Sequence, residues 1–152
     1  MSVHVELMVV QRKAETMWDG DLLKGNGSVK VGSGALPQFP VTWASRTEQP
    51  GGKTSPEELL MAAHSACYSM AFSAALGRNK TPPQSLHVTA TSSFDKVGEG
   101  WKITKVDLQV VGKVPGLSQA QFQELAKAAE KGCPVSNALR NNVEITVSAK
   151  LE

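Results

Sequence analysis

The sequence predicts an α+β fold in which antiparallel β-sheet packs around a long, buried helix. Segments with the alternating apolar pattern of strands occur in runs on both sides of one long apolar segment, whereas a parallel α/β fold alternates strands and helices one by one. The chain has 152 residues, of which 41% are hydrophobic and 20% charged, and these values suit one globular domain with a sizeable core. We therefore expect a single domain over residues 1–152.

The N-terminal third is expected to consist of strands and hairpins. Residues 3–9 alternate between apolar and mostly polar side chains, which is the period of a half-buried strand. Glycines then divide residues 18–46 into short pieces, and residues 28–31 and 41–45 have a strand-like composition. This pattern favours hairpin-rich structure.

A long helix is predicted after the loop at residues 49–54. A serine, a proline and two glutamates at residues 55–58 form the pattern of a capping box with proline in the first helical turn. We expect the helix to run to Leu76, with Gly77 as its C-terminal cap. Apolar or small residues surround its axis, so one sheet could not cover it and a second subunit is expected to do so.

The same segment could be taken for a transmembrane helix. Residues 59–77 carry no charge and approach the ~20 residues that a bilayer requires. However, the segment contains His64 and three serines, is rich in alanine and has no flanking aromatic belt. With no signal-peptide pattern at the N-terminus, we expect a cytoplasmic protein that does not contact membranes.

A β-hairpin is predicted after the proline pair that follows the helix. Residues 86–94 and 101–110 alternate in the manner of strands, and the turn between them contains two glycines. The phase of the apolar residues changes near Lys105, which would reverse the buried face of the strand unless a β-bulge absorbs one residue. We therefore expect a bulge at this point.

Two further helices and one strand are predicted in the C-terminal third. Ser118 opens an amphipathic helix that ends at Gly132. Cys133, followed by proline, begins a short helix that extends to about Arg140. Alternating apolar residues at 143–151 indicate a final strand.

Composition argues against several classes of function. The net charge is +2, from 16 basic and 14 acidic side chains, and no basic block is present, so nucleic acids are not expected partners. The sequence contains no phosphate-binding glycine loop and no hydrolase or metalloprotease signature. His64 and Cys67 lie one helical turn apart, but the remaining histidines and Cys133 lack metal-ligand spacing, so neither a metal nor a cofactor is expected.

Each of the two cysteines can have a structural role or a reactive one. Cys67, in the middle of the long helix, is either a small core residue or a reactive thiol, and the second role requires a nearby cation because burial raises a thiol pKa. Cys133 is either a simple capping residue or a thiolate stabilised by the start of a helix. Two thiols that folding brings together could run a peroxide-reducing cycle from thiolate to sulfenic acid to disulfide.

Two segments carry a resemblance to a known family. Residues 54–70 read Thr-Ser-Pro-Glu-Glu-Leu-Leu-Met-Ala-Ala-His-Ser-Ala-Cys-Tyr-Ser-Met, and residues 132–136 read Gly-Cys-Pro-Val-Ser. Together they closely resemble the OsmC/Ohr family of thiol peroxidases, in its OsmC branch. Shorter similarities at residues 18–21, 94–97 and 100–105 extend the resemblance over nearly the whole chain.

The resemblance implies a fold, an activity and partners. The fold would be an intertwined homodimer, with antiparallel β-sheets wrapped around two long central helices and active sites at the subunit interface. The activity would be the reduction of organic hydroperoxides, and less efficiently of hydrogen peroxide, in oxidative or osmotic stress defence. An external dithiol, in this family a lipoylated protein rather than thioredoxin, would recycle the enzyme.

The resemblance also assigns catalytic roles. Cys67 would be the peroxidatic thiol and Cys133 the resolving thiol, and the two would form an intramolecular disulfide. Arg46, paired with Glu57, would hold its guanidinium over Cys67, lower the thiol pKa and orient the peroxide. Arg12 is an alternative source of this cation, because the Ohr branch takes its arginine from nearer the N-terminus.

Two other functions remain open beside the peroxidase. A non-catalytic homodimer could use the same region to bind a hydrophobic ligand, in which case both thiols would be inert. A redox sensor could change the shape of its dimer when the disulfide forms, although no DNA-reading helix or basic patch supports such an output.

Overall fold

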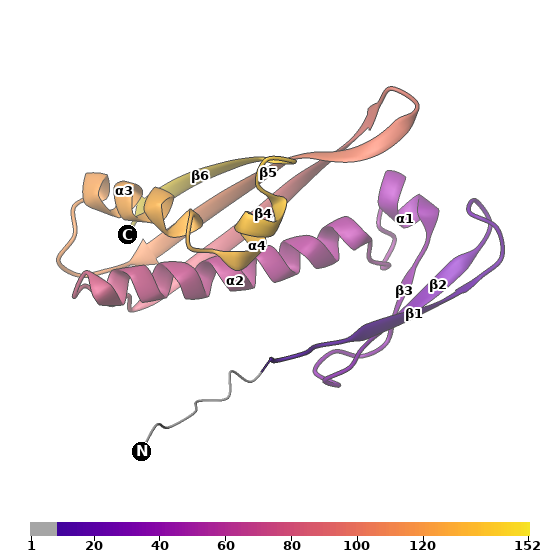
Figure 1. Cartoon of the computed structure of the whole chain (residues 1–152), viewed down its shortest axis with the longest axis horizontal. Coiled ribbons are helices and arrows are strands. Elements are labelled where there is room, and N and C mark those ends of the chain that lie inside the picture. Colours follow the sequence, from indigo (N-terminus) through magenta and orange to yellow (C-terminus); the bar gives the residue numbers. More distant parts are fainter. Residues whose placement is uncertain (1–8) are drawn as a thin grey trace, which may run out of the picture. The chain divides into compact units, whose positions relative to one another are not determined.

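A computed structural model describes residues 9–152 of the chain (Figure 1). Contacts divide the chain into two compact units, Met1–Ser55 and Pro56–Glu152. The strand expected at residues 3–9 lies, apart from its last residue, outside the described part. The two units are described separately below.

The first unit contains a three-stranded antiparallel meander. Its strands are β1 (Ala14–Asp19), β2 (Asn26–Val31) and β3 (Phe39–Val41), in the order β1-β2-β3. Strands β1 and β2 are packed closely where Trp18 pairs with Gly27, because a Cβ atom on Gly27 would lie 2.8 Å from the ring of Trp18. The prediction of hairpin-rich structure is confirmed for this part of the chain.

A short helix, α1 (Trp43–Thr47), follows β3 where the sequence predicted that a strand would continue to residue 45. The side chain of Thr42 accepts a hydrogen bond from the Ser45 N–H at 3.0 Å, and the Ser45 hydroxyl accepts one from the Thr42 N–H at 3.0 Å. This reciprocal capping box satisfies two donors at a helix start. The strand prediction was wrong here because a local side-chain pattern outweighs the apolar alternation.

The second unit begins with the long helix α2 (Pro56–Arg78). The predicted start is confirmed, but the predicted cap at Gly77 is wrong because this residue lies inside the helix. The helix ends instead where Lys80 adopts a left-handed φ of 61°. The Lys80 N–H then donates to the Gly77 carbonyl and the Thr81 N–H to the Leu76 carbonyl, both at 3.0 Å, which is the hydrogen-bond pattern of a Schellman motif.

A three-stranded sheet follows, with the order β4-β5-β6. The hairpin strands β4 (Ser85–Val97) and β5 (Gly100–Lys113) are antiparallel, as predicted. The last strand, β6 (Glu144–Leu151), pairs with β5 in parallel, so this sheet is mixed and the expectation of purely antiparallel pairing was wrong for one pair. The parallel pairing is possible because two helices connect β5 to β6, a crossover long enough to return the chain to the same end of the sheet.

The predicted β-bulge is present in the hairpin. Ser93 pairs with Lys105, whereas the next residue, Phe94, pairs with Ile103. One extra residue, Thr104, therefore stands on β5 directly before Lys105, where the apolar phase of the sequence changes. The bulge keeps the buried face of the strand continuous.

Two helices lie between β5 and β6. They are α3 (Gln119–Glu130), which begins with a capping box from Ser118, and α4 (Pro134–Leu139). Helix α2 packs on β4, α3 packs on β6, and α2 and α3 contact each other. The second unit is thus a layer of helices against one sheet, with α3 seen beside β6 in Figure 1.

The core of the second unit lies between these two layers. Three of its aromatic rings form a row, with centroids 5.8 Å apart for Tyr68 and Phe72 and 5.1 Å apart for Phe72 and Phe122. The other large fully buried apolar side chains of this core are Leu76, Val106, Leu108 and Val110. Such a core is of the kind that stabilises a single domain without disulfides.

Helix α2 buries one face only. The buried positions recur every three or four residues and include Met61 and Leu76, whereas Met70 on another face is 69% exposed. The expectation of a helix covered all round is therefore not met within one chain. By length and apolar composition alone, α2 could also cross a membrane. In its most apolar stretch of 18 residues, 28% is buried inside the structure.

Candidate active site around the two cysteines

The fold brings Cys67 and Cys133 together. Cys67 lies in the middle of α2, Cys133 lies at the start of α4, and the two thiols are hydrogen-bonded to each other in their reduced form. Cys67 is half-buried, whereas Cys133 is fully buried. An oxidant arriving from solvent can thus reach the first sulfur, and the second is placed to attack it once oxidised.

The turn between α3 and α4 aims Cys133 at this position. The Cys133 N–H donates to the Glu130 carbonyl at 3.1 Å, and Pro134 starts α4 immediately afterwards. Cys133 occupies the N-cap, but its side chain makes no capping hydrogen bond. The thiol is turned toward Cys67 instead, which argues against a purely capping role.

The surroundings of Cys67 keep it in the thiol form. Burial raises the pKa of the Cys67 thiol, and a hydrogen bond from the backbone of Val135 opposes this by favouring the thiolate. The neighbouring Cys133 raises the pKa further, through its hydrogen bond and its charge. A reactive Cys67 therefore requires a cation to lower its pKa.

Glu57, expected at the site, is buried in the first turn of α2. It precedes Cys67 by ten residues on the same helix, and at 1.5 Å per residue the two backbones are about 15 Å apart. The Glu57 carboxylate therefore cannot reach the Cys67 sulfur of its own chain. Any contact between these two groups has to join two copies of the chain.

The two candidate arginines belong to the first unit. Arg46 lies in the last turn of α1, with its guanidinium carbon 5.7 Å from the centroid of the Trp43 ring, a cation–π arrangement. Arg12 precedes β1 and donates a hydrogen bond to the carbonyl of Gln11 at 2.8 Å.

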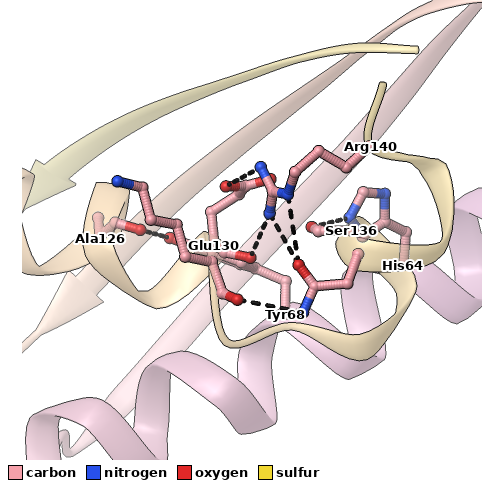
Figure 2. Close-up of polar contacts among 8 residues, drawn as sticks. His64, Tyr68, Ala126, Glu130, Ser136 and Arg140 are labelled. Atoms are coloured by element: carbon pink, nitrogen blue, oxygen red, sulfur yellow. Dashed lines mark hydrogen bonds and ion pairs between the residues drawn. The ribbon is translucent and has the colours of Figure 1, made fainter. Parts of the chain in front are cut away.

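A group of polar side chains beside the cysteines was not found from the sequence (Figure 2). His64 Nε2 lies 2.7 Å from the Ser136 hydroxyl, and both residues are fully buried. The Tyr68 hydroxyl donates to the Ala126 carbonyl at 2.7 Å. His64, Tyr68 and Ser136 stand close to a cysteine in the sequence, but their partners depend on how the α3–α4 segment packs on α2.

A partly buried ion pair lies in the same group. The guanidinium of Arg140 is 3.0 Å from one carboxylate oxygen of Glu130 and donates to the other at 3.1 Å. The same guanidinium donates to the Asn137 side-chain carbonyl at 3.0 Å. These contacts tie the end of α3 to the residue that follows α4 (Figure 2).

Burial also shifts two titratable groups of the cluster. It lowers the pKa of His64, an effect that the negative charge of Glu130 partly offsets. It raises the pKa of Tyr68 well above the ordinary value, and the charges of Glu130 and Cys133 act in the same direction. His64 and Tyr68 are therefore neutral hydrogen-bonding groups around neutral pH.

The described residues contain no group of three or more histidine, cysteine, aspartate or glutamate side chains placed to hold a metal ion. Several polar side chains around the cysteines contact one another through hydrogen bonds and one ion pair. The chemistry that this arrangement offers is thiol chemistry.

Comparison with known proteins places the chain in a family. Residues 49–148 match the sequence model of OsmC-like proteins. The chain is 41% identical to peroxiredoxin OsmC of Escherichia coli over 95% of its length and 99% of that protein. It is 31% identical to the organic hydroperoxide resistance protein of Xanthomonas axonopodis over 64% of its length and 68% of that protein.

Solved structures agree on the fold. The crystal structure of an organic hydroperoxide resistance protein OsmC from Legionella pneumophila superposes with a TM-score of 0.72 at 24% identity. The match covers 94% of this chain and 98% of that one, so the predicted α+β architecture is confirmed. The chain belongs to the OsmC-like protein family.

Proposed function

We propose that this protein is a cysteine-based peroxidase that reduces organic hydroperoxides, and hydrogen peroxide less efficiently, in oxidative or osmotic stress defence. The observation that carries the proposal is the adjacency of a half-buried and a fully buried thiol in Cys67 and Cys133. Relatives named peroxiredoxin OsmC and organic hydroperoxide resistance protein support the same activity.

The cycle has two chemical steps. The Cys67 thiolate attacks the peroxide, the O–O bond breaks, and Cys67 becomes a sulfenic acid while the alkoxide takes up a proton and leaves as the alcohol. The Cys133 thiolate then attacks the Cys67 sulfur, a disulfide forms, and the sulfenic oxygen leaves as water after taking up a proton. One hydroperoxide is reduced to an alcohol and water, and two thiols are oxidised to one disulfide.

Activation of Cys67 is assigned to Arg46 together with Glu57. Because burial raises the pKa of Cys67, a cation has to favour the thiolate, and a guanidinium held by a carboxylate suits this task. Arg12 is the alternative source of the charge. Substitution of Arg46 and of Arg12, one at a time, distinguishes these two assignments.

The active form is proposed to be a homodimer of one OsmC-like domain over residues 1–152. The ten-residue separation of Glu57 and Cys67 on one helix supports a site completed by a second copy. The exposed apolar residue Met70 on α2 supports a partner on that face. The family match, which crosses the boundary between the two units, supports a single domain.

Recycling requires an external dithiol, which we propose to be a lipoylated protein. Reduction of the disulfide by thiol exchange restores both cysteines. A two-cysteine cycle of this kind needs a reducing environment, which supports a location in the cytoplasm.

The decisive experiment adds one equivalent of an alkyl hydroperoxide, or of hydrogen peroxide, and follows intact mass and free thiols. The proposal expects rapid loss of both thiols and of about two hydrogens, faster with the alkyl peroxide, and no such loss in Cys67→Ser. Survival of both thiols in the folded wild type would instead favour the non-catalytic ligand-binding protein. Bound apolar ligands would then be sought by mass spectrometry.

A further inference from the structure

Helix α2, which carries Cys67, is hydrogen-bonded to the α3–α4 segment at two points. One point lies before Cys133 in the sequence and the other lies after it. Before Cys133, the Ala126 carbonyl accepts a hydrogen bond from Tyr68, the residue after Cys67. After Cys133, Ser136 is hydrogen-bonded to His64, one turn before Cys67. Figure 2 shows both connections between α2 and the α3–α4 segment.

The hydrogen bond between His64 and Ser136 lies in the interior, where water cannot replace either partner. Both residues have no exposed surface, and the Nε2–Oγ distance is 2.7 Å. His64 Nδ1 has no hydrogen-bond partner among the described residues, so within this part of the chain the ring is hydrogen-bonded through Nε2 to Ser136. Loss of this contact would leave a second ring nitrogen buried without a partner, which is unfavourable.

The segment from the end of α3 to the residue after α4 is also held together by its own contacts. The ion pair of Glu130 and Arg140 joins the residue three positions before Cys133 to the residue seven positions after it. The Asn137 side-chain amide donates to the Lys131 carbonyl at 3.1 Å. These contacts brace the turn that bears Cys133, so its attachment to α2 sets where the Cys133 sulfur lies.

We propose that His64 and Ser136 are positioning residues for closure of the Cys67–Cys133 disulfide. Neither residue touches the peroxide in this scheme. Their hydrogen bond holds α4 on α2 so that the Cys133 sulfur stays within reach of Cys67, which removes the orientational entropy that a free segment would lose on reacting. The inference rests on the peroxidase function proposed above and concerns its second chemical step alone.

Positioning matters because the second step competes with over-oxidation. After the first step, Cys67 is a sulfenic acid that a second peroxide can convert to a sulfinic acid, which the disulfide cycle cannot reduce. The closure step protects Cys67 only if it is faster than this second oxidation. A Cys133 sulfur that is held close to Cys67 makes disulfide closure faster than the second oxidation.

The test separates the two chemical steps in rapid-quench mass spectrometry with one equivalent of an alkyl hydroperoxide. Ser136→Ala is expected to leave Cys67 oxidation within about twofold of wild type but to slow disulfide closure about fivefold, the scale of one lost net hydrogen bond. The sulfenic acid should then accumulate and be trapped by dimedone. Ser136→Thr, which retains the hydroxyl, should restore closure.

His64 gives an independent pair of variants. His64→Gln keeps an amide near the position of Nε2, and His64→Leu removes every hydrogen-bonding atom. Closure should be slow in His64→Leu and faster in His64→Gln. Gly27→Ala, whose added Cβ would crowd the Trp18 ring in the first unit and has none of its nearest contacts on α2 or the α3–α4 segment, serves as a destabilised control and should close at the wild-type rate.

A second measurement needs no peroxide. Equilibration of each variant with reduced and oxidised dithiothreitol should shift Ser136→Ala toward the dithiol by about fivefold, which is about 20 mV for a two-electron couple. If the protein is not a peroxidase, hydroperoxide leaves the wild-type thiols intact, whereas this equilibrium still reports on positioning. The inference would be overturned by wild-type closure and equilibrium in both Ser136→Ala and His64→Leu. Equally slow closure in Gly27→Ala would overturn it as well.

Discussion

The carboxylate of Glu130, whose side chain is 9% exposed, lies 3.0 Å from the guanidinium of Arg140. The arginine side chain is 37% exposed, so the pair stands at the edge of the second unit with its negative partner turned inward. A buried carboxylate is tolerated when it is paired and hydrogen-bonded, and it is costly when its partner is removed.

We expect Arg140→Met to lower the free energy of unfolding by about 1–3 kcal/mol, because the Glu130 carboxylate stays buried without its ion pair. The measurement is urea denaturation at fixed protein concentration. Lys113→Met provides the control, since Lys113 and Glu152 are more than half exposed and 3.8 Å apart, and should change stability by less than about 0.5 kcal/mol. Equal effects of the two substitutions would contradict the buried role of Glu130.

Gly112 on β5 should not tolerate a side chain. A Cβ atom there would lie 2.6 Å from the Phe122 ring and 3.0 Å from Leu86, and Phe122 is fully buried. Gly112→Ala is therefore expected to cost about 1–3 kcal/mol by overpacking. Gly100→Ala, whose added Cβ would meet no atom within 4 Å beyond its chain neighbours, should be close to neutral in the same thermal melts. A neutral Gly112→Ala would mean that the core at this point is looser than described.

His64 should make stability depend on pH in the acid range. Its pKa in the folded protein is lowered by burial, so the unfolded chain takes up a proton first as the pH falls below about 6.5. The unfolded state then binds more protons than the folded one, and the free energy of unfolding decreases as the pH falls toward the lowered pKa.

Urea titrations from pH 7.5 to 5 would measure this slope. His64→Gln should flatten the pH dependence, since the amide does not titrate. His87→Gln, at an exposed position on β4, should leave the slope unchanged. A slope that persists in His64→Gln would assign the acid sensitivity to other groups.

Much of the fold could be predicted because local patterns determine its elements. The capping residues at 55–58 start α2, Ser118 starts α3, and the change of apolar phase near Lys105 marks the bulge. The exact end of α2 could not be predicted, because Lys80 adopts a left-handed conformation that a non-glycine residue seldom takes. The parallel pairing of β6 with β5 depends on where the crossover returns the chain, and periodicity does not encode this.

For the site, the sequence predicted the two cysteines but not the contacts around them. Cys67 and Cys133 stand in recognisable segments, and their thiols are hydrogen-bonded to each other in the structure, while their catalytic roles stay predictions. The pairing of His64 with Ser136 joins positions 72 residues apart and follows from the packing of α4 on α2. The roles assigned to Arg46 and Glu57 stay predictions, which substitution can test.

Arg46→Ala is expected to slow the reaction of Cys67 with an alkyl hydroperoxide at pH 7 by about tenfold or more. Burial already raises the pKa of Cys67, and removal of a neighbouring cation typically raises a thiol pKa by a further ~1–3 units, so less thiolate is present. The pH–rate profile should shift to higher pH, and Arg46→Lys should recover part of the rate. Arg12→Ala is the matched control. Loss of activity in Arg12→Ala with normal kinetics in Arg46→Ala would transfer the role to Arg12.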